Sequence, residues 1–450
     1  MKRDSIDFGK TNIPRLFVKL FIPTVLGMLF NSIFNIADGI FVGKGIGSNA
    51  LAAVNISAPL YTLSTGLGLL FGTGASVVAQ IHLSRKNTKA ANINITQALT
   101  IPSVLMCGII VLIMVFAPQL NYIFGGSEKL EPLSVDYIRY VSPTFLFMII
   151  MIVGMFIIRL DGSPKYAMLS NVIPSVLNIF LDWAFIFPLD MGIKGAAIAT
   201  STAQGLGALM VLLYFVKKTK VISLYMPKFS RTSLRLTARN AGYMCKLGFA
   251  TFVGEIAMSF IMMTGNYTFM SRLQEDGVAA FSIACYLLPI IFMFGGAIGQ
   301  SVLPIVSFNH GLKNKARIYS TLKLALCLTA TCGMFMTWLS VMFNDQLLML
   351  FIDKGTRAFE IASSGLDYYS AGFLFISINL VMITFLQSIE RSKIALVFMV
   401  LRGFVIVLPA FFILPSVIGD AGLWLSIPVA ESAVTLLIAV YTVINRKKLY

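Results

Sequence analysis

The two halves of this 450-residue chain repeat each other at a constant offset of 227 positions. The residues that keep this offset fall mostly in hydrophobic segments: Lys19–Leu20 with Lys246–Leu247, Gly27 with Gly254, Ala52–Ala53 with Ala279–Ala280, Gly68 and Gly72 with Gly295 and Gly299, and Gly192 and Gly195 with Gly419 and Gly422. A repeat of this length is far longer than one unit of a solenoid. The sequence therefore predicts a duplicated half-protein, an arrangement known in polytopic membrane proteins.

The composition places the chain in a membrane. Hydrophobic residues make up 57% of it, charged residues only 12%, and the mean hydropathy is +0.85. A soluble protein of this length has no way to bury so much apolar surface, so the soluble classes are excluded.

Twelve segments are long enough to cross roughly 30 Å of hydrocarbon as helices. They lie near residues 15–41, 51–82, 93–117, 134–160, 166–188, 193–216, 243–272, 279–308, 318–343, 361–389, 394–414 and 421–445. Because each half has an even number of spans, six, both halves have the same orientation in the membrane. The expected pseudo-two-fold axis therefore runs along the membrane normal. We expect an all-α polytopic membrane protein with a first lobe at 1–216, a linker at 217–242 and a second lobe at 243–450.

Lysine and arginine are concentrated on one side of these spans, and this predicts the orientation. The basic side includes both termini, the linker, and the loops that carry Arg85, Lys86, Lys89, Lys313, Lys315 and Arg317. Both termini are therefore expected to be cytoplasmic. The net charge of +16 is explained by these topology signals and by contacts with anionic lipid headgroups, not by nucleic-acid binding. The linker is expected to form a short amphipathic helix on the inner membrane surface.

Apart from Asp136 and Asp367, which are near the ends of their spans, four acidic residues lie inside predicted spans: Asp38, Asp182, Glu255 and Glu431. A carboxylate in a membrane costs about 2.5–3.5 kcal/mol on insertion scales for Asp, so each is a functional hypothesis by default. Asn178 precedes Asp182 by one helical turn, and both project from one face. Counted from the outer surface, Asp38, Asn178, Asp182 and Thr200 reach a similar depth in the first lobe.

Two carboxylates, an amide carbonyl and a hydroxyl form an all-oxygen set that suits a hard cation such as Na⁺. Without a metal, the same set is a pair of carboxyl groups in a low-dielectric interior, where desolvation and like charge favour binding of a proton. Both ions stay open at this point. The alternative for Asp38 alone is that it terminates its helix near water.

The second lobe has no copy of this set, because Asp38 aligns with Gly265 and Asp182 with Pro409. Glu255 is instead a candidate for a substrate-facing charge, or it pairs with a base such as Arg402 or with a hydroxyl. Glu431 is a weaker candidate, since Ser426 and Ser432 can satisfy it. The expected substrate-binding residues are Glu255, Gln204, Arg402 and Glu431.

The chain resembles the multidrug and toxic compound extrusion (MATE) transporters, bacterial type, over essentially its full length. The segments that carry the resemblance are NSIFNIADGIFVG (31–43), GTGASVVAQ (72–80), LDGSPKYAM (160–168), NVIPSVLNIFLD (171–182), GIKGAAIATSTAQ (192–204) and LQSIERSKIAL (386–396). The resemblance implies a V-shaped antiporter of the bacterial inner membrane that expels organic cations and amphiphilic drugs as H⁺ or Na⁺ enters. It also implies that Asp38, Asn178, Asp182 and Thr200 bind the ion. No cofactor is expected. The protein is expected to be a monomer.

Two other functions compete with this interpretation. A lipid-linked oligosaccharide flippase of related architecture needs a cationic cavity for a pyrophosphate, whereas the spans here hold acids and only Arg402 as a base. A membrane-embedded transferase places catalytic groups at the membrane boundary, but His82 and His310 lack partner spacing. The sequence therefore favours a cation exporter over a flippase and over an enzyme.

Overall fold

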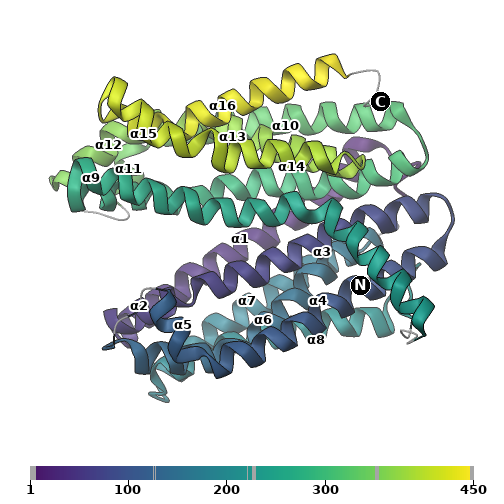
Figure 1. Ribbon diagram of the computed structural model, residues 1–450, viewed down its shortest axis with the longest axis horizontal. Helices are drawn as coiled ribbons and strands as arrows, with labels where there is room; N and C mark the ends of the chain where they lie inside the picture. The colour runs from purple at the N-terminus through teal and green to yellow at the C-terminus, as the bar shows by residue number, and fades with distance from the viewer. Residues whose placement is uncertain are drawn as a thin grey trace. The chain divides into compact units, whose positions relative to one another are not determined.

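The computed structural model is built of helices, and it describes residues 7–124, 126, 128–219, 221–225, 230–349 and 354–445. The helices are α1 (Ile13–Gly45), α2 (Ser48–Ile56), α3 (Ala58–Ser84), α4 (Thr88–Val115), α5 (Ala117–Ile123), α6 (Glu131–Leu160), α7 (Pro164–Ile186), α8 (Gly192–Lys217), α9 (Arg231–Gly311), α10 (Lys315–Met342), α11 (Asn344–Leu348), α12 (Arg357–Ser370), α13 (Phe373–Ser388), α14 (Ser392–Val400), α15 (Val407–Ile418) and α16 (Ala421–Ile444) (Figure 1). A π-helical turn, Leu401–Val405, joins α14 to α15. α9 comprises two helices that meet at Gln274, whose backbone is not helical.

Among the described residues, eleven helical segments are long and apolar enough to cross a membrane, and the bent pair of α12 and α13 makes a twelfth. The prediction of twelve spans is confirmed, because each predicted segment overlaps one of these. Two spans are broken where the sequence suggested continuous ones. The second begins as α2 and restarts at Ala58, and the tenth bends by 44° between Ser370 and Phe373.

The chain divides into two compact units. The first comprises Met1–Thr11 with Val18–Gly248, and the second comprises Asn12–Phe17 with Phe249–Tyr450. The start of α9 therefore belongs to the first unit. The linker after residue 230 is continuous with the seventh span, so the separate surface helix expected there is wrong for these residues. Lys220, residues 226–229 and the basic tail at 446–450 lie outside the described residues.

The same turn follows the second span of each repeat. Lys86 and Lys313, which are 227 positions apart, both have a left-handed backbone, with φ of 58° and 57°. The next residues, Asn87 and Asn314, both cap the following helix by accepting a hydrogen bond at 3.2 Å from the backbone N–H three residues on. The offset found in the sequence therefore persists in the backbone.

In the first unit, α3 packs closely on α6 through glycines. A Cβ added at Gly68 would meet Ile152 at 3.0 Å, and one added at Gly72 would meet the Phe156 ring at 2.7 Å. Small residues allow such close approach of helices in lipid, where no hydrophobic effect drives them together. Gly68 and Gly72 therefore allow α3 and α6 to pack closely.

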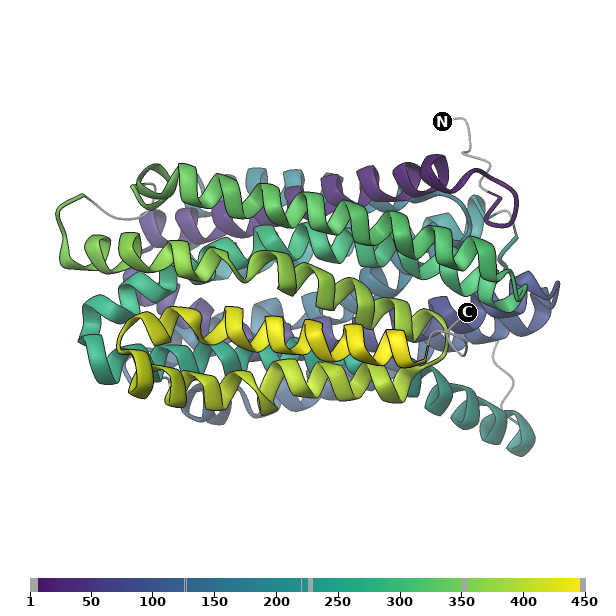
Figure 2. The same ribbon diagram turned by 90° about the horizontal axis from the view of Figure 1, so that it is seen from above.

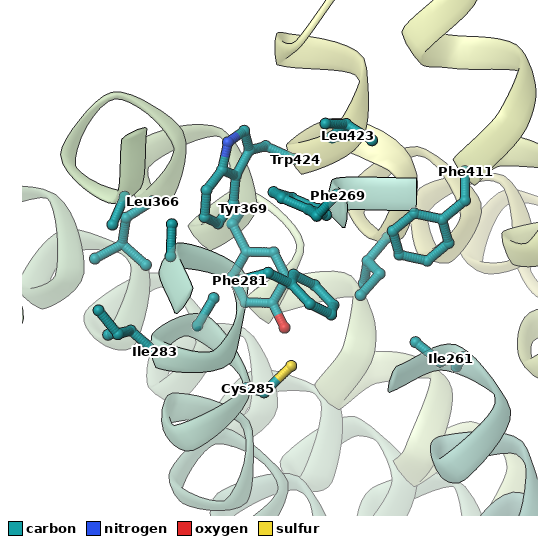
Figure 3. Close-up of a cluster of buried hydrophobic side chains, with 14 of the residues drawn as sticks. Ile261, Phe269, Phe281, Ile283, Cys285, Leu366, Tyr369, Phe411, Leu423 and Trp424 are labelled. Atoms are coloured by element: carbon teal, nitrogen blue, oxygen red, sulfur yellow. The ribbon is translucent and has the colours of Figure 1, made fainter. Parts of the chain in front are cut away.

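The second unit has an aromatic core. Its buried members include Phe269, Phe281, Tyr369, Phe411 and Trp424 (Figure 3). Phe269 stacks on Phe281 at 4.7 Å between ring centroids and meets Trp424 edge to face at 5.0 Å. Such pairs contribute about 0.5–1.5 kcal/mol each beyond their buried area. The last helices of this unit, α15 and α16, run side by side (yellow-green and yellow in Figure 2).

This core fills the place that polar residues hold in the first unit. Gly265, which aligns with Asp38, lies directly against the Phe281 ring. A Cβ added at this glycine would be only 2.3 Å from the nearest ring atom. Ile427, which aligns with Thr200, belongs to the same buried cluster. The two units thus share a helical arrangement and differ in the chemistry at this level.

Candidate ion site in the first unit

Asp38 lies on the inward face of α1. The exposed apolar residues of this helix recur every three or four positions, as expected for one lipid-facing stripe: Val18, Ile22, Leu26, Leu29, Ile33, Ile36 and Ile40. Asp38 is two residues from both Ile36 and Ile40, which rotates it about 200° away from that stripe. Its side chain is half-buried.

Asn178 and Asp182 are enclosed one turn apart on α7, and Thr200 faces them from α8. Their exposed fractions are 1%, 0% and 3%. Only one orientation of the Asn178 amide pairs donors with acceptors: its nitrogen donates to Asp182 Oδ2 at 2.6 Å, and its oxygen accepts from the Thr200 backbone N–H at 3.2 Å. The opposite orientation would place the amide nitrogen 3.4 Å from Thr200 Oγ1.

The carboxyl groups of Asp38 and Asp182 are neighbours and interact electrostatically. The Oδ1 atom of each is buried and accepts no hydrogen bond within the described part of the chain. No lysine, arginine or histidine among those residues forms an ion pair with either. Two adjacent carboxyls without a counter-charge form a site that a small cation or a proton stabilises.

Two tyrosines that sequence reasoning missed lie beside these acids. The hydroxyls of Tyr61 on α3 and Tyr137 on α6 are 3.2 Å apart, and both phenols are within electrostatic range of Asp38 and Asp182. Tyr61 also packs edge to face on Phe145 at 5.2 Å. The signal available in the sequence was weak, because tyrosine is common near the ends of membrane spans.

The four residues predicted to bind the ion are therefore brought together from α1, α7 and α8. The donor set fits a hard cation in its chemistry, with two carboxylates, an amide and a hydroxyl. In the orientation that pairs its donors with acceptors, however, the amide presents its nitrogen to Asp182. Coordination of a metal ion by Asn178 would require the amide to turn over.

The predicted substrate residues lie in two different settings. Gln204 on α8 is one turn from Thr200 on the same face and is half-buried. Glu255 on α9 is also half-buried, and it forms no hydrogen bond or ion pair with the described residues. The predicted alternative that Glu255 pairs with Arg402 is not observed.

Arg402 instead pairs with Glu431 inside the second unit. Its Nε and Nη2 donate to Glu431 Oε1 at 3.0 and 2.5 Å, and Asn379 donates to Oε2 at 2.6 Å. Arg402 is 6% exposed and Glu431 is 3% exposed. Ser426 and Ser432, expected as partners of Glu431, bond to backbone carbonyls of their own helix. Both charges are satisfied without a ligand, so we expect the pair to hold α13, α16 and the π-helical turn together.

The family model described as MatE matches residues 23–184 and 250–413, which is most of the chain and one match in each repeat. The chain belongs to the MatE family. It is therefore a multi-pass membrane transporter and not an enzyme.

Relatives of this MatE chain match it from end to end. The multidrug export protein MepA of Staphylococcus aureus strain MRSA252 is 23% identical over 452 residues, covering 98% of this chain and 96% of its own length. The protein of the same name from Staphylococcus saprophyticus is also 23% identical, with the same coverage.

Solved structures show the same fold. An outward-facing multidrug resistance MATE family transporter of the MOP superfamily superposes with a TM-score of 0.90 at 21% identity, covering 100% of this chain and 99% of the other. A MOP superfamily transporter from Pyrococcus furiosus, described as having a binding pocket of reverse polarity, gives 0.90 at 20% identity and covers 98% of both chains. The all-α architecture of two six-helix lobes is thus confirmed for this MatE protein.

Proposed function

We propose that this transporter is a secondary active multidrug antiporter that exports organic cations and amphiphilic drugs in exchange for H⁺ or Na⁺. The observation that carries the proposal is the pair of adjacent carboxyl groups, Asp38 and Asp182, with unbonded oxygens and no counter-charge among the described residues. A structural role alone does not explain two such groups in a membrane, since each raises the free energy of insertion.

The ion acts by neutralising this pair. Without an ion, the two carboxyls repel each other in a low-dielectric interior, which disfavours any state that encloses them. With an ion bound, the enclosed state becomes favourable. A ligand shifts such an equilibrium by its difference in affinity for the two states, and a few kcal/mol is enough to drive alternating access.

Asn178 distinguishes the two coupling ions. The orientation that pairs its donors with acceptors donates to Asp182 and suits a carboxyl pair that binds a proton. The opposite orientation directs the amide oxygen to Asp182 and suits a sodium ion held between them. We propose that the amide nitrogen faces Asp182 if the protein is coupled to H⁺ and that the amide oxygen faces it if the protein is coupled to Na⁺.

The substrate class follows from charge and from the relatives. Both proteins named MepA are described as multidrug export proteins. Glu255, half-buried and without a partner in the described residues, supplies a negative charge for a cationic drug. Gln204 supplies a polar contact, whereas Arg402 and Glu431 neutralise each other and are weaker candidates.

The same pairing argues against the flippase alternative. A lipid-linked pyrophosphate requires an unpaired cation in the cavity, and Arg402 is bound to Glu431. We propose that the protein lies in the bacterial inner membrane with both termini in the cytoplasm, as the distribution of its basic loops indicates. We propose that it works there as a monomer, without a cofactor and with lipid as its surroundings.

The test is ethidium efflux in inverted membrane vesicles, driven by a proton gradient or by a sodium gradient. Asp182→Asn should abolish the efflux driven by the coupling ion. Asp136→Asn is the matched control, because Asp136 is an exposed acid of the same unit that pairs with Lys194 at 3.2 Å. If Asp182→Asn leaves both rates at the level of the control, the first-unit ion site is wrong.

A further inference from the structure

The start of α9 has one face that docks on the first unit. Thr237, Asn240, Met244 and Leu247 follow the three- and four-residue spacing of a single helical face. Gln97 of α4 donates to Thr237 at 2.9 Å and accepts from Asn240 at 3.1 Å. Met244 and Leu247 are buried. These contacts fix how the helix is rotated.

The opposite face carries a basic stripe, which we define as Arg231, Arg235, Arg239 and Lys246. At 100° per residue these positions lie about 180° from the docking face. All four side chains are exposed, and none forms an ion pair with a residue that the structure describes. The stretch 217–248 contains no aspartate or glutamate to neutralise them.

The contact with Gln97 places the stripe at the boundary of the membrane. Gln97 is nine residues into α4, about 13 Å along the helix from its start at Thr88. The segment before Gln97 is polar, TKAANINIT, and the apolar run of α4 begins directly after it. Thr237 and Asn240 are at the level of this change, so the arginines beside them are at the level of the headgroups.

Exposed leucines border the stripe on both sides. Leu234 is 54% exposed and Leu236 is 43% exposed, and on the helix they lie on either side of Arg235. A helix with arginines between exposed leucines suits the interface of a bilayer, where the leucines enter the acyl region and the guanidinium groups remain among phosphates.

We propose that the basic stripe binds the phosphate groups of anionic phospholipids in the leaflet on the linker side. Guanidinium groups bind phosphate oxygens in a bidentate manner. The arginines recur every four residues along the side of the helix that faces away from the protein core. Bound lipid would therefore contact the outer face of α9. The linker is held from the other side, where the backbone N–H of Tyr225 donates to Thr96 Oγ1 at 3.0 Å.

The test is native mass spectrometry of the full-length protein in detergent, titrated with phosphatidylglycerol or with zwitterionic phosphatidylcholine. The variant R231Q/R235Q/R239Q removes three charges of the stripe. The matched control R85Q/K86Q/K89Q removes three exposed charges from the turn after α3 and the first turn of α4. R231K/R235K/R239K keeps the charge, and a melting curve of each variant verifies folding.

The wild type should bind phosphatidylglycerol in preference to phosphatidylcholine, and raising the salt concentration tenfold should weaken that binding at least tenfold. Each arginine near a charged surface contributes about fivefold, so the triple glutamine variant should lose about a hundredfold in affinity. The loop control and the triple lysine variant should stay within about tenfold of wild type. Equal losses in the loop control and the stripe variant, salt-insensitive binding, or no loss in the stripe variant would overturn the proposal. None of these outcomes depends on drug transport.

Discussion

At the level of single residues, the two units differ at the positions that form the candidate ion site of the first unit. Asp38 and Thr200 of the first unit correspond to Gly265 and Ile427 of the second, and these two lie in an aromatic core. The free energy of a buried carboxyl pair depends on whether an ion is bound to it. A packed aromatic core has no such dependence, so we propose that ion sensitivity belongs to the first unit.

The first prediction concerns the balance of stability and activity at Asp182. Asp182→Asn should raise the melting temperature of the purified protein by a few degrees at neutral pH, because it removes the repulsion between two adjacent carboxyls. Transport should be lost in the same variant. The measurement is a melting curve in detergent beside the efflux assay. A lower melting temperature together with retained efflux would contradict the role assigned to this residue.

The second prediction concerns Tyr137. Tyr137→Phe keeps the ring and removes the hydroxyl that lies 3.2 Å from that of Tyr61. We expect ion-driven efflux to fall about tenfold, since one partner in a buried polar network contributes roughly 1–2 kcal/mol. Drug binding without a gradient should be unchanged. An efflux rate equal to wild type would show that the phenol pair has no part in ion binding.

Much of the candidate site could be predicted from the sequence. Helical spacing placed Asn178 and Asp182 on one face, and depth counting placed Asp38 and Thr200 beside them. Tyr61, Tyr137 and the pairing of Arg402 with Glu431 could not be predicted in this way. They depend on which faces of different helices meet, and spacing within a single helix does not determine that.

At the level of elements, glycine decides how closely the helices of the first unit approach. Gly72→Val should lower the free energy of unfolding by about 1–3 kcal/mol, because its side chain would overlap the Phe156 ring. Gly108→Val on α4 is the matched control, since nothing lies within 4 Å of a Cβ there. Melting curves of both variants in the same detergent make the comparison. Equal melting temperatures would exclude the close packing of α3 on α6.

A buried ion pair holds three elements of the second unit. Arg402→Met should lower the free energy of unfolding by about 3–5 kcal/mol, because it leaves Glu431 charged and buried. The double variant R402M/E431L should recover most of that loss, since no unpaired charge remains. Chemical unfolding of the single and double variants tests this. A double variant as unstable as the single one would show that packing, and not charge, dominates at this position.

The elements themselves were predicted well, and their breaks were not. All twelve spans follow from hydrophobic length. The restart at Ala58 does not, because α2 and α3 are both apolar. The bend at residues 370–373 was missed although α12 is more polar than α13, because hydrophobic length does not report a change of helix direction. The continuation of α9 back to Arg231 was also missed. Its first turns are too polar for a span, and contacts with α4 stabilise them.

At the level of the whole molecule, duplication gave the protein two bundles with the same turns, such as those at Lys86 and Lys313. Within the described part of the chain, only the first holds adjacent acids without a counter-charge. In our account, an ion bound there competes with a drug bound elsewhere, and this competition makes the transporter an exchanger. The coupling is reciprocal, so drug binding must release the ion.

The most direct test is therefore ion release on drug binding. Ethidium is added to purified protein in weakly buffered solution, and the released protons are counted with a pH indicator, or the released sodium with a tracer. We predict that the wild type releases close to one ion for each drug bound and that D38N/D182N releases none. Equal release from both proteins would contradict the assignment of the coupling ion to Asp38 and Asp182.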